Sequence, residues 1–292
     1  MFSGEAYFLE EGKLEKYWDV VAFETEREEL DVRLAKWRKA ARNWLAHYAE
    51  KKTYDFIAQT FQKYVTIREN AEILDVGCGP GKWVNFFAER GFKVTGVDIS
   101  PWMIRLAKKR LKNDFKTRVK FFVMDVAKLD LPDNFYDMVN CVTVLQHIFD
   151  DKKVRRAIHE MVRVVKPLGY ILLFEAAPSF YFKNKTPHVH YISMKTYIRE
   201  FEKAGAQLIY WRATDLSFPI TFFGLRKYAA TFSKKAYYFL ASKPSFFPPN
   251  FLSFLSKILM LLAKPIDYGL ADSPLGFLSI GKILLFRKVK KY

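Results

Sequence analysis

Apolar and polar residues alternate along the middle of the chain with two different periods. Short apolar runs predict buried strands, and apolar residues that recur three or four positions apart predict helices. Strands are expected at 73–76, 92–98, 119–125, 136–142, 170–175 and 206–212. Helices are expected near 81–90, 101–111, 150–165 and 193–204, with Gly91 and Gly205 where glycines commonly end a helix. This alternation over residues 71–215 predicts an α/β core with helices on both faces of a mostly parallel sheet.

The region before this core has a purely helical pattern. Across residues 1–70, apolar side chains such as Tyr17 and Trp18 recur three or four positions apart, and 51–65 predicts one further helix. We interpret residues 1–70 as a helical cap packed on the core, in preference to a separate functional module. Residues 276–292 contain a last expected strand and a basic tail.

The segment 216–275 is a basic, aromatic-rich insertion with a helical pattern. From Leu216 to Ile266 it has no Asp or Glu, seven Lys or Arg, and twelve Phe or Tyr. Residues 251–262 form one broad apolar helical face, which is too short to cross a bilayer because a crossing needs about 20 residues. The segment fits either an element that enters the membrane interface or a lid that packs over the active site.

The most specific motif follows the first expected strand. Residues 73–83 read Ile-Leu-Asp-Val-Gly-Cys-Gly-Pro-Gly-Lys-Trp, so three glycines separate a strand from a helix. Glycines let the backbone approach a ligand closely, and a strand, turn and helix in this order are typical of nucleotide sites. Dinucleotide sites have G-x-G-x-x-G and phosphate loops have G-x-x-x-x-G-K-[ST]. Here Asp75 precedes G-x-G-x-G, which fits neither pattern.

Residues 74–81 (LDVGCGPG) resemble the first motif of class I S-adenosylmethionine (SAM) methyltransferases, and further similarities continue in order to about residue 178. The resemblance implies a Rossmann-like fold with seven strands, in which an antiparallel last strand at 281–289 pairs between the fifth and sixth. It implies SAM as cofactor, with acids after the second and third strands that face the ribose and the adenine. The implied cofactor-binding residues are Asp75, Gly77, Cys78, Gly79, Gly81, Asp98, Ile99, Met103, Asp125, Val126, Val142 and Gln146.

Three histidines are candidate catalytic residues, because methylation of a hydroxyl needs a general base. His147 follows the fourth strand and could equally shape the cofactor pocket. His188 and His190 follow the fifth strand and would share one face of an extended segment, with exposure to solvent as the alternative. They predict no zinc site, because further ligands do not follow at the usual spacing. The expected substrate-contacting residues are Tyr17, Trp18, Glu175 and Tyr191, although Glu175 could equally hold a loop.

Charge and cysteine content indicate which partners and which cellular compartment to expect. The net charge is +17, and residues 216–292 hold 12 Lys or Arg against 2 Asp or Glu. This charge favours an anionic partner, which is either a membrane surface or RNA. The chain has two cysteines, Cys78 and Cys141, and its first residues do not read as a leader. We therefore expect a cytoplasmic protein that associates peripherally with membranes.

The turn after the fourth strand indicates the class of acceptor. It reads Asn140-Cys141-Val142-Thr143-Val144, whereas enzymes of this fold that methylate amines of nucleic-acid bases carry an Asn/Asp-Pro-Pro-aromatic turn there. The sequence therefore predicts a SAM-dependent methyltransferase that acts on a small, apolar or lipid-like acceptor such as a quinone. The alternatives are an RNA methyltransferase that uses the basic C-terminal region and a catalytically idle SAM-binding partner subunit. The acceptor atom and the oligomeric state are not predicted.

Overall fold

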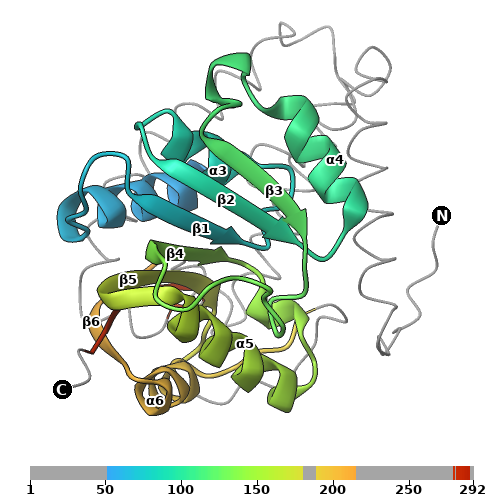
Figure 1. Ribbon diagram of the computed structural model, residues 1–292. Helices are drawn as coiled ribbons and strands as arrows, with labels where there is room; N and C mark the ends of the chain where they lie inside the picture. The colour runs from blue at the N-terminus through green and yellow to red at the C-terminus, as the bar shows by residue number, and fades with distance from the viewer. Residues whose placement is uncertain (1–50, 180–188, 215–278, 280, 290–292) are drawn as a thin grey trace, which may run out of the picture.

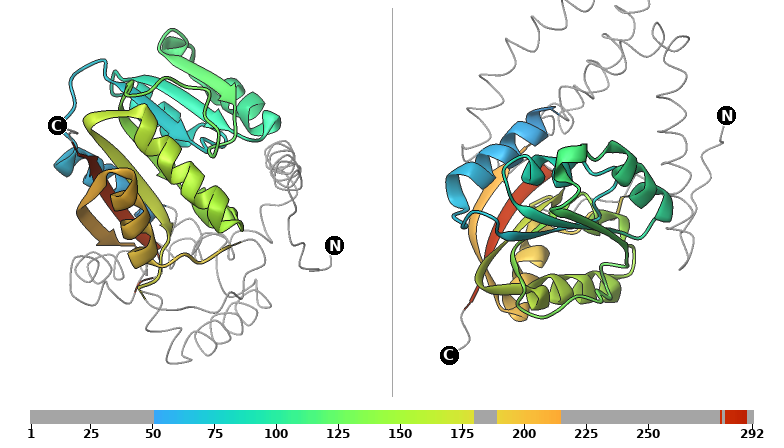
Figure 2. Two further views of the ribbon diagram at one scale, coloured as in Figure 1. Left: turned by 60° about the horizontal axis from the view of Figure 1, so that its bottom comes forward. Right: turned by 45° about the horizontal axis from the view of Figure 1, so that its top comes forward.

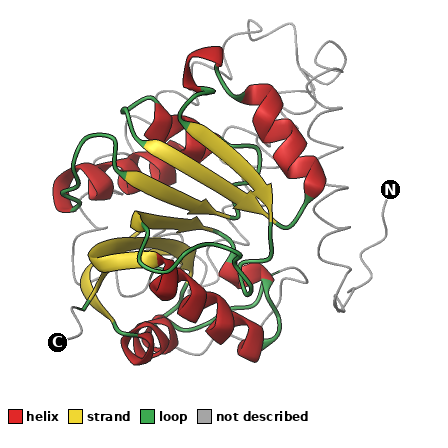
Figure 3. Ribbon diagram, in the orientation of Figure 1, coloured by secondary structure: helices red, strands yellow, loops and turns green. Residues whose placement is uncertain are grey.

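A computed structural model describes residues 51–179, 189–214, 279 and 281–289. Its centre is a seven-stranded sheet in the order β3-β2-β1-β4-β5-β7-β6 (Figures 1 and 3). β7 runs antiparallel to both of its neighbours, β5 and β6, and the other pairs are parallel. The predicted mostly parallel sheet, with its last strand between the fifth and the sixth, is confirmed. The strands are β1 (Glu72–Val76), β2 (Lys93–Asp98), β3 (Val119–Val123), β4 (Tyr136–Val142), β5 (Val165–Ala176), β6 (Ala206–Ala213) and β7 (Gly281–Lys288).

Helices cover both faces of this sheet, as the alternating pattern predicts. A helix over residues 51–64, α3 and α4 lie on one face, and α5 and α6 lie on the other (Figure 2). Their apolar side chains pack against the strands in two separate clusters. Two buried clusters therefore sandwich the strands. The labelled helices are α3 (Lys82–Ala88), α4 (Pro101–Arg110), η1 (Asn113–Phe115), η2 (Leu145–His147), α5 (Asp151–Val164) and α6 (Met194–Ala204).

Local sequence signals set the ends of these helices. The Ser100 hydroxyl accepts a hydrogen bond from the Met103 N–H at 3.1 Å before α4, and Pro101 occupies the first helical position. Ser and Pro are favoured at these positions, because the hydroxyl satisfies an orphan N–H and Pro has none to lose. Gly205 ends α6 in the left-handed region at φ 96°, which a glycine adopts without steric cost.

Two predicted boundaries differ from the structure. β3 ends at Val123, so Asp125 lies in the loop that follows and not on the strand. β5 begins directly where α5 ends, at Val165, and it includes Leu168 at φ 64°. The segment 165–169, which reads as an approach to the fifth strand, is therefore part of it.

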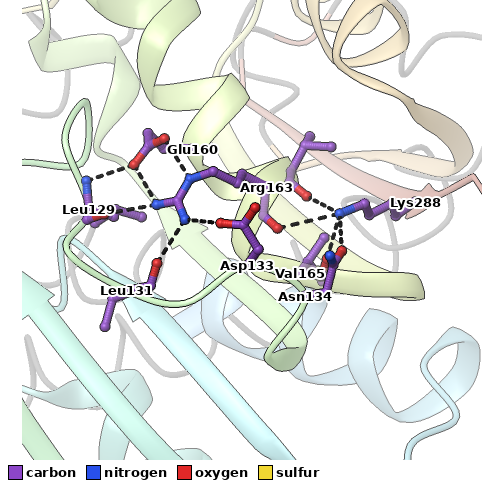
Figure 4. A network of polar contacts seen from close by, with 9 residues as sticks. Leu129, Leu131, Asp133, Asn134, Glu160, Arg163, Val165 and Lys288 are labelled. Atoms are coloured by element: carbon purple, nitrogen blue, oxygen red, sulfur yellow. Dashed lines mark hydrogen bonds and ion pairs between the residues drawn. The ribbon is translucent and has the colours of Figure 1, made fainter.

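Arg163 joins the end of α5 to the loop of residues 129–133, and Lys288 joins it to β7 (Figure 4). The Arg163 guanidinium donates to the carbonyls of Leu129 and Leu131 and to the carboxylates of Glu160 and Asp133. Hydrogen bonding to Arg163 holds the pKa of Glu160 below its usual range. The Lys288 ammonium, near the end of β7, donates to the carbonyls of Val162 and Val165 at 2.7 and 2.8 Å.

Several expectations lie outside the described residues. These are the cap residues Tyr17 and Trp18, the candidate base His188, and the whole of the 216–275 insertion. The choice between a membrane-interface element and a lid therefore stays a prediction.

Candidate active site

The glycine turn after β1 leaves backbone beside open space. Gly77, Gly79 and Gly81 have φ values of 61°, 49° and 83°, a region that side chains disfavour. A Cβ on Gly77 would lie 2.3 Å from Cγ2 of Val144, so Gly77 allows the turn after β4 to pack closely against it. A Cβ on Gly79 would meet nothing within 4 Å. Gly79 therefore borders a space that a ligand could occupy.

Asp98, at the end of β2, is tied to this turn. Its carboxylate accepts hydrogen bonds from the Gly79 N–H and the Ser100 N–H, both at 2.9 Å. The Cys78 N–H donates to the Val97 carbonyl at 2.9 Å and adds a second link between the turn and β2. Each carboxylate oxygen can accept more than one hydrogen bond. Asp98 can therefore fix the turn and still accept from a ligand.

A cavity of about 520 Å³ opens at the carboxyl ends of β1, β2 and β4. That volume lies within the ~300–1,000 Å³ typical of small-molecule sites, and this edge of a parallel sheet is where such folds bind ligands. The cavity contains most of the predicted cofactor-binding residues: Gly77, Cys78, Gly79, Asp98, Ile99, Met103, Asp125, Val126 and Val142. Its other described lining residues are Thr53, Tyr54, Val76, Pro80, Lys82, Trp83, Val97, Met124, Thr143, Val144, His147, Ile148, Lys153 and Phe174.

Asp125 is paired with a lysine within this cavity. One oxygen of its carboxylate lies 2.7 Å from the Lys153 ammonium, and the other accepts from the Ala127 N–H at 2.9 Å. Lys153 lies in the first turn of α5, and its side chain is only 14 % exposed. Sequence reasoning missed Lys153, because a lysine in a run of charged helical residues reads as a solvated side chain.

An aromatic wall was also missed. Tyr54, from the helix over 51–64, stacks on Trp83 of α3 with ring centroids 5.0 Å apart, and the Lys82 ammonium lies 5.0 Å from the Tyr54 ring centroid. Burial raises the pKa of Tyr54 above its usual value. The three residues are distributed over two helices, so no single motif signals them.

The turn after β4 carries His147 into the cavity, as predicted. The same turn places Thr143 at φ 57°, which is strained for a β-branched residue and costs about 1–3 kcal/mol. The Gln146 side chain does not line the cavity. Its amide oxygen accepts from the Ala176 N–H at 2.8 Å, and its amide nitrogen lies 3.3 Å from Nε2 of His147. Gln146 therefore contacts His147, whereas a contact with the cofactor was expected.

Glu175 holds this turn and does not reach the acceptor space. It is fully buried, and its carboxylate accepts from the N–H groups of Val144, Leu145 and Gln146 at 2.8, 2.9 and 3.1 Å. This placement does not support the expected substrate contact, and it matches the alternative in which Glu175 holds a loop. Burial raises the pKa of Glu175 to about 7, although the three backbone N–H donors oppose that rise.

Asp75 and Gly81 are not among the residues that line the cavity. Asp75 is 1 % exposed, and its carboxylate accepts from the Asn140 side chain at 2.7 Å. Its burial raises its pKa to about 7. Gly81 is the N-cap of α3, where a Cβ would lie 3.2 Å from Cβ of Ala107. These two residues shape the turn from inside the fold.

His190 is not in the cavity either. Its N–H donates to the Gln146 carbonyl at 2.7 Å, and its ring Nδ1 lies 3.0 Å from the Ile148 carbonyl oxygen. The ring stacks on Phe149, with centroids 5.9 Å apart. His190 thus docks the segment after β5 against the His147 turn, and the predicted catalytic role is not supported by this placement. Tyr191, beside it, also lies outside the cavity lining.

Residues 73–169 match the family described as the methyltransferase domain. This match runs from β1 into β5 and includes the glycine turn, so this part of the chain is similar to SAM-dependent methyltransferases of class I. Among its relatives is a ubiquinone biosynthesis O-methyltransferase of Alkalilimnicola ehrlichii, 31% identical over 51% of this chain and 60% of that protein. A mitochondrial enzyme of the same name from Schizosaccharomyces pombe is 32% identical over 44% of this chain and 46% of that protein.

Solved structures agree with the fold. A structure of a putative sarcosine dimethylglycine methyltransferase from Galdieria sulphuraria aligns with a TM-score of 0.55 at 17% identity, over 82% of this chain and 87% of that one. At that identity the likeness concerns the fold alone. The chain spans only 60% and 46% of the lengths of these two curated relatives, so their activities are carried over only as proposals.

SAM is the cofactor of this family, and the residues at the glycine turn fit it. The open space beside Gly79 suits the close approach of a ligand. Asp98 has acceptor capacity left for the paired ribose hydroxyls. Asp125 lies in the same cavity as Val126 and Ile99, which offer an acceptor beside apolar surface for an adenine.

Proposed function

We propose that this chain is a methyltransferase that moves a methyl group from SAM to a hydroxyl of a small, apolar, quinone-like acceptor. The observation that supports this most is the placement of His147 on the wall of the cavity that also holds the glycine turn and Asp98. O-methylation needs a proton acceptor beside the methyl donor. The names of the ubiquinone biosynthesis relatives point to the same class of acceptor.

The chain's own residues would divide the work as follows. Gly79 and Asp98 hold the ribose side of the cofactor, and Asp125, oriented by Lys153, faces the adenine. When bound, SAM supplies a methyl group that its sulfonium charge already activates. The protein therefore has to position the acceptor and keep water out, which can account for a large part of the rate.

His147 takes the hydroxyl proton in this proposal. The Gln146 amide is oriented by the Ala176 N–H that donates to its oxygen, so its nitrogen is turned toward Nε2 of His147. In the neutral ring the Gln146 N–H donates to the Nε2 lone pair, so the acceptor hydroxyl must displace this contact before Nε2 can take its proton. A neutral imidazole with an oriented lone pair is a competent proton acceptor near neutral pH.

The acceptor space is lined by apolar side chains on the same walls. Val142, Ile148 and Phe174 lie in the cavity with His147.

No helix among the described residues has both the length and the apolar character that a membrane crossing requires.

The test is methylation of defined acceptors by the purified full chain with deuterated SAM. We expect a labelled methyl ether on a prenylated catechol. The matched compound in which both hydroxyls are already methylated should give no product. His147→Ala should lower kcat by about 100-fold, within the ~10²–10⁴-fold range of general base catalysis. His159→Ala, on the exposed face of α5, is the matched control and should retain activity.

Two results would contradict the proposal. Label on bulk tRNA with none on the catechol would favour the RNA alternative. Tight binding of S-adenosylhomocysteine (SAH) by calorimetry, with no product on any acceptor, would favour the idle partner subunit.

A further inference from the structure

We propose that Glu175 is a positioning residue: it holds the turn that carries His147 at the cavity, without reaching the cavity itself. The inference rests on the proposed function for its kinetic readout. Hydrogen bonds between residues 143–146 and residues 174–176 are the observations behind it. The reacting groups are proposed to lie on one side of this turn, and Glu175 lies on the other.

Five hydrogen bonds join these two short segments. The Thr143 N–H donates to the Phe174 carbonyl at 2.8 Å, and the next three N–H groups all donate to the Glu175 carboxylate. In return, the Ala176 N–H donates to the side-chain oxygen of Gln146. Every residue from 143 to 146 is therefore fixed to the end of β5.

Only an acceptor with two oxygens satisfies this arrangement. The N–H groups of Val144 and Leu145 converge on Oε1 of Glu175, and the Gln146 N–H donates to Oε2. A glutamine at position 175 has one acceptor oxygen, and its NH₂ group would face an N–H. Buried donors that lose their acceptor are costly, so this substitution should loosen the turn.

Within the described residues, the three N–H groups donate to Glu175 and to no other oxygen atom. The Cys141 thiol on β4 lies 3.9 Å from Oε1, as a weak donor to the carboxylate. The fully buried Tyr197 hydroxyl on α6 has no hydrogen-bond partner within the described part of the chain. Lys282 on β7 is the cross-strand neighbour of Glu175, and its ammonium donates to the Ser279 carbonyl.

Movement of the turn would reach the reacting groups directly. His147, Val144 and Ile148 line the cavity from this turn, and Val144 is the side chain that leaves no room for a Cβ on Gly77. Thr143 adds a strained φ of 57°, which persists only when its surroundings hold it. A displacement of ~1 Å in such a site can lower a rate by about 100-fold.

The experiment compares Glu175→Gln and Glu175→Ala with the wild-type full chain by three measurements. Hydrogen exchange by mass spectrometry should be at least about 10-fold faster for the amides of 144–146 in both variants. With the prenylated catechol, kcat should fall about 10-fold in Glu175→Gln and about 100-fold in Glu175→Ala. The Kd of SAH should change less than kcat, because Asp98 and Gly79 are untouched.

Asp137→Asn is the matched control. Asp137 is a carboxylate on β4 that accepts from the Glu72 N–H at 2.9 Å and pairs with Lys166, outside the cavity lining. Its substitution should lower stability while kcat and the exchange of 144–146 stay at wild-type values. If Glu175→Ala does not fold, Glu175→Gln still gives the comparison.

The outcomes separate this inference from the proposed function. Unchanged exchange at 144–146, or faster exchange with an unchanged kcat, would overturn the role of Glu175. If the wild-type chain methylates no acceptor, the proposed function fails. The inference is then decided by exchange together with modification of His147 by diethyl pyrocarbonate. An unchanged modification rate in Glu175→Gln would overturn it.

Discussion

Asp75 and Asn140 are cross-strand neighbours on β1 and β4, fully enclosed behind the glycine turn. The Asn140 amide donates to Oδ1 of Asp75, whereas Oδ2 of Asp75 and Oδ1 of Asn140 have no partner within the described residues. When Asp75 is protonated, its O–H can donate a hydrogen bond, and Oδ1 of Asn140 is a nearby acceptor without a partner among the described residues. Burial, and then the charge of Asp98, raise the pKa of Asp75 to about 7.

This raised pKa predicts a pH-dependent stability. Between the unfolded value near 4 and the folded value near 7, the native state keeps a proton that the unfolded chain releases. The free energy of unfolding should therefore fall as pH rises through that window, by up to about 1.4 kcal/mol per pH unit for this group. Urea unfolding at pH 5, 6 and 7 measures the slope.

Asp75→Asn removes this group from the titration. Its amide can accept from Asn140 as Asp75 does, and it adds the donor that Oδ1 of Asn140 lacks. We expect a shallower dependence on pH than in the wild type, with the share of Glu175 remaining. Equal slopes for variant and wild type would show that Asp75 is ionised throughout the window.

Asp98 predicts a specific loss of cofactor binding. Asp98→Asn replaces one acceptor oxygen with an NH₂ group beside the N–H of Gly79 or Ser100. Hydrogen bonds to a charged group contribute about 1.5–3 kcal/mol, so the Kd of SAH should rise by roughly 10- to 150-fold in calorimetry. Asp114→Asn, on the exposed η1, is the control. Equal affinity in both variants would remove Asp98 from the site.

At the scale of elements, α5 joins the site to the end of the chain. Its first turn supplies Lys153 to the cavity. At its other end, the carbonyl of Val162 in its last turn and that of Val165, the first residue of β5, accept from Lys288 (Figure 4). A cation is favourable at a helix C-terminus because it faces the negative end of the dipole. One helix therefore connects the cavity to β7.

Lys288→Met tests this second connection. It removes an ammonium that satisfies carbonyls of residues 162 and 165 and the side chain of Asn134. We expect the free energy of unfolding to fall by about 1–3 kcal/mol, measured by chemical denaturation. Lys195→Met, at an exposed position of α6, should change it by less than about 0.5 kcal/mol. A similar loss in both variants would assign the effect to the general loss of charge.

For the whole molecule, the features predicted correctly from the sequence are those that depend on the periodicity of apolar residues or on one contiguous motif. Strand and helix positions follow from the spacing of apolar residues, and the glycine turn is read directly from residues 77–81. The pairing of Lys153 with Asp125 was not predictable, because it joins a charged helix to a loop. The docking role of His190 was also missed, and for Glu175 the sequence left a substrate contact and a loop-holding role equally open, because burial against a turn depends on tertiary packing that no local pattern records.

The position of β7 predicts how the sheet responds to truncation. β7 pairs with both β5 and β6 and, among the strands that the structure describes, it alone connects β6 to the rest of the sheet. A chain that ends at residue 278 should lose amide protection in β6 and the cooperative unfolding transition. A chain that ends at Val289 is the control and should keep both. Retained protection of β6 in the shorter chain would contradict the sheet order.

The same position has a consequence for synthesis on the ribosome. Ala213 and Gly281 are 68 positions apart, which corresponds to roughly 3–14 s of elongation at about 5–20 residues per second. Throughout that interval the nascent chain exposes the unpaired edges of β5 and β6, which are competent for illegitimate strand pairing. A chaperone that shields those edges until β7 pairs with them would raise the yield of native protein.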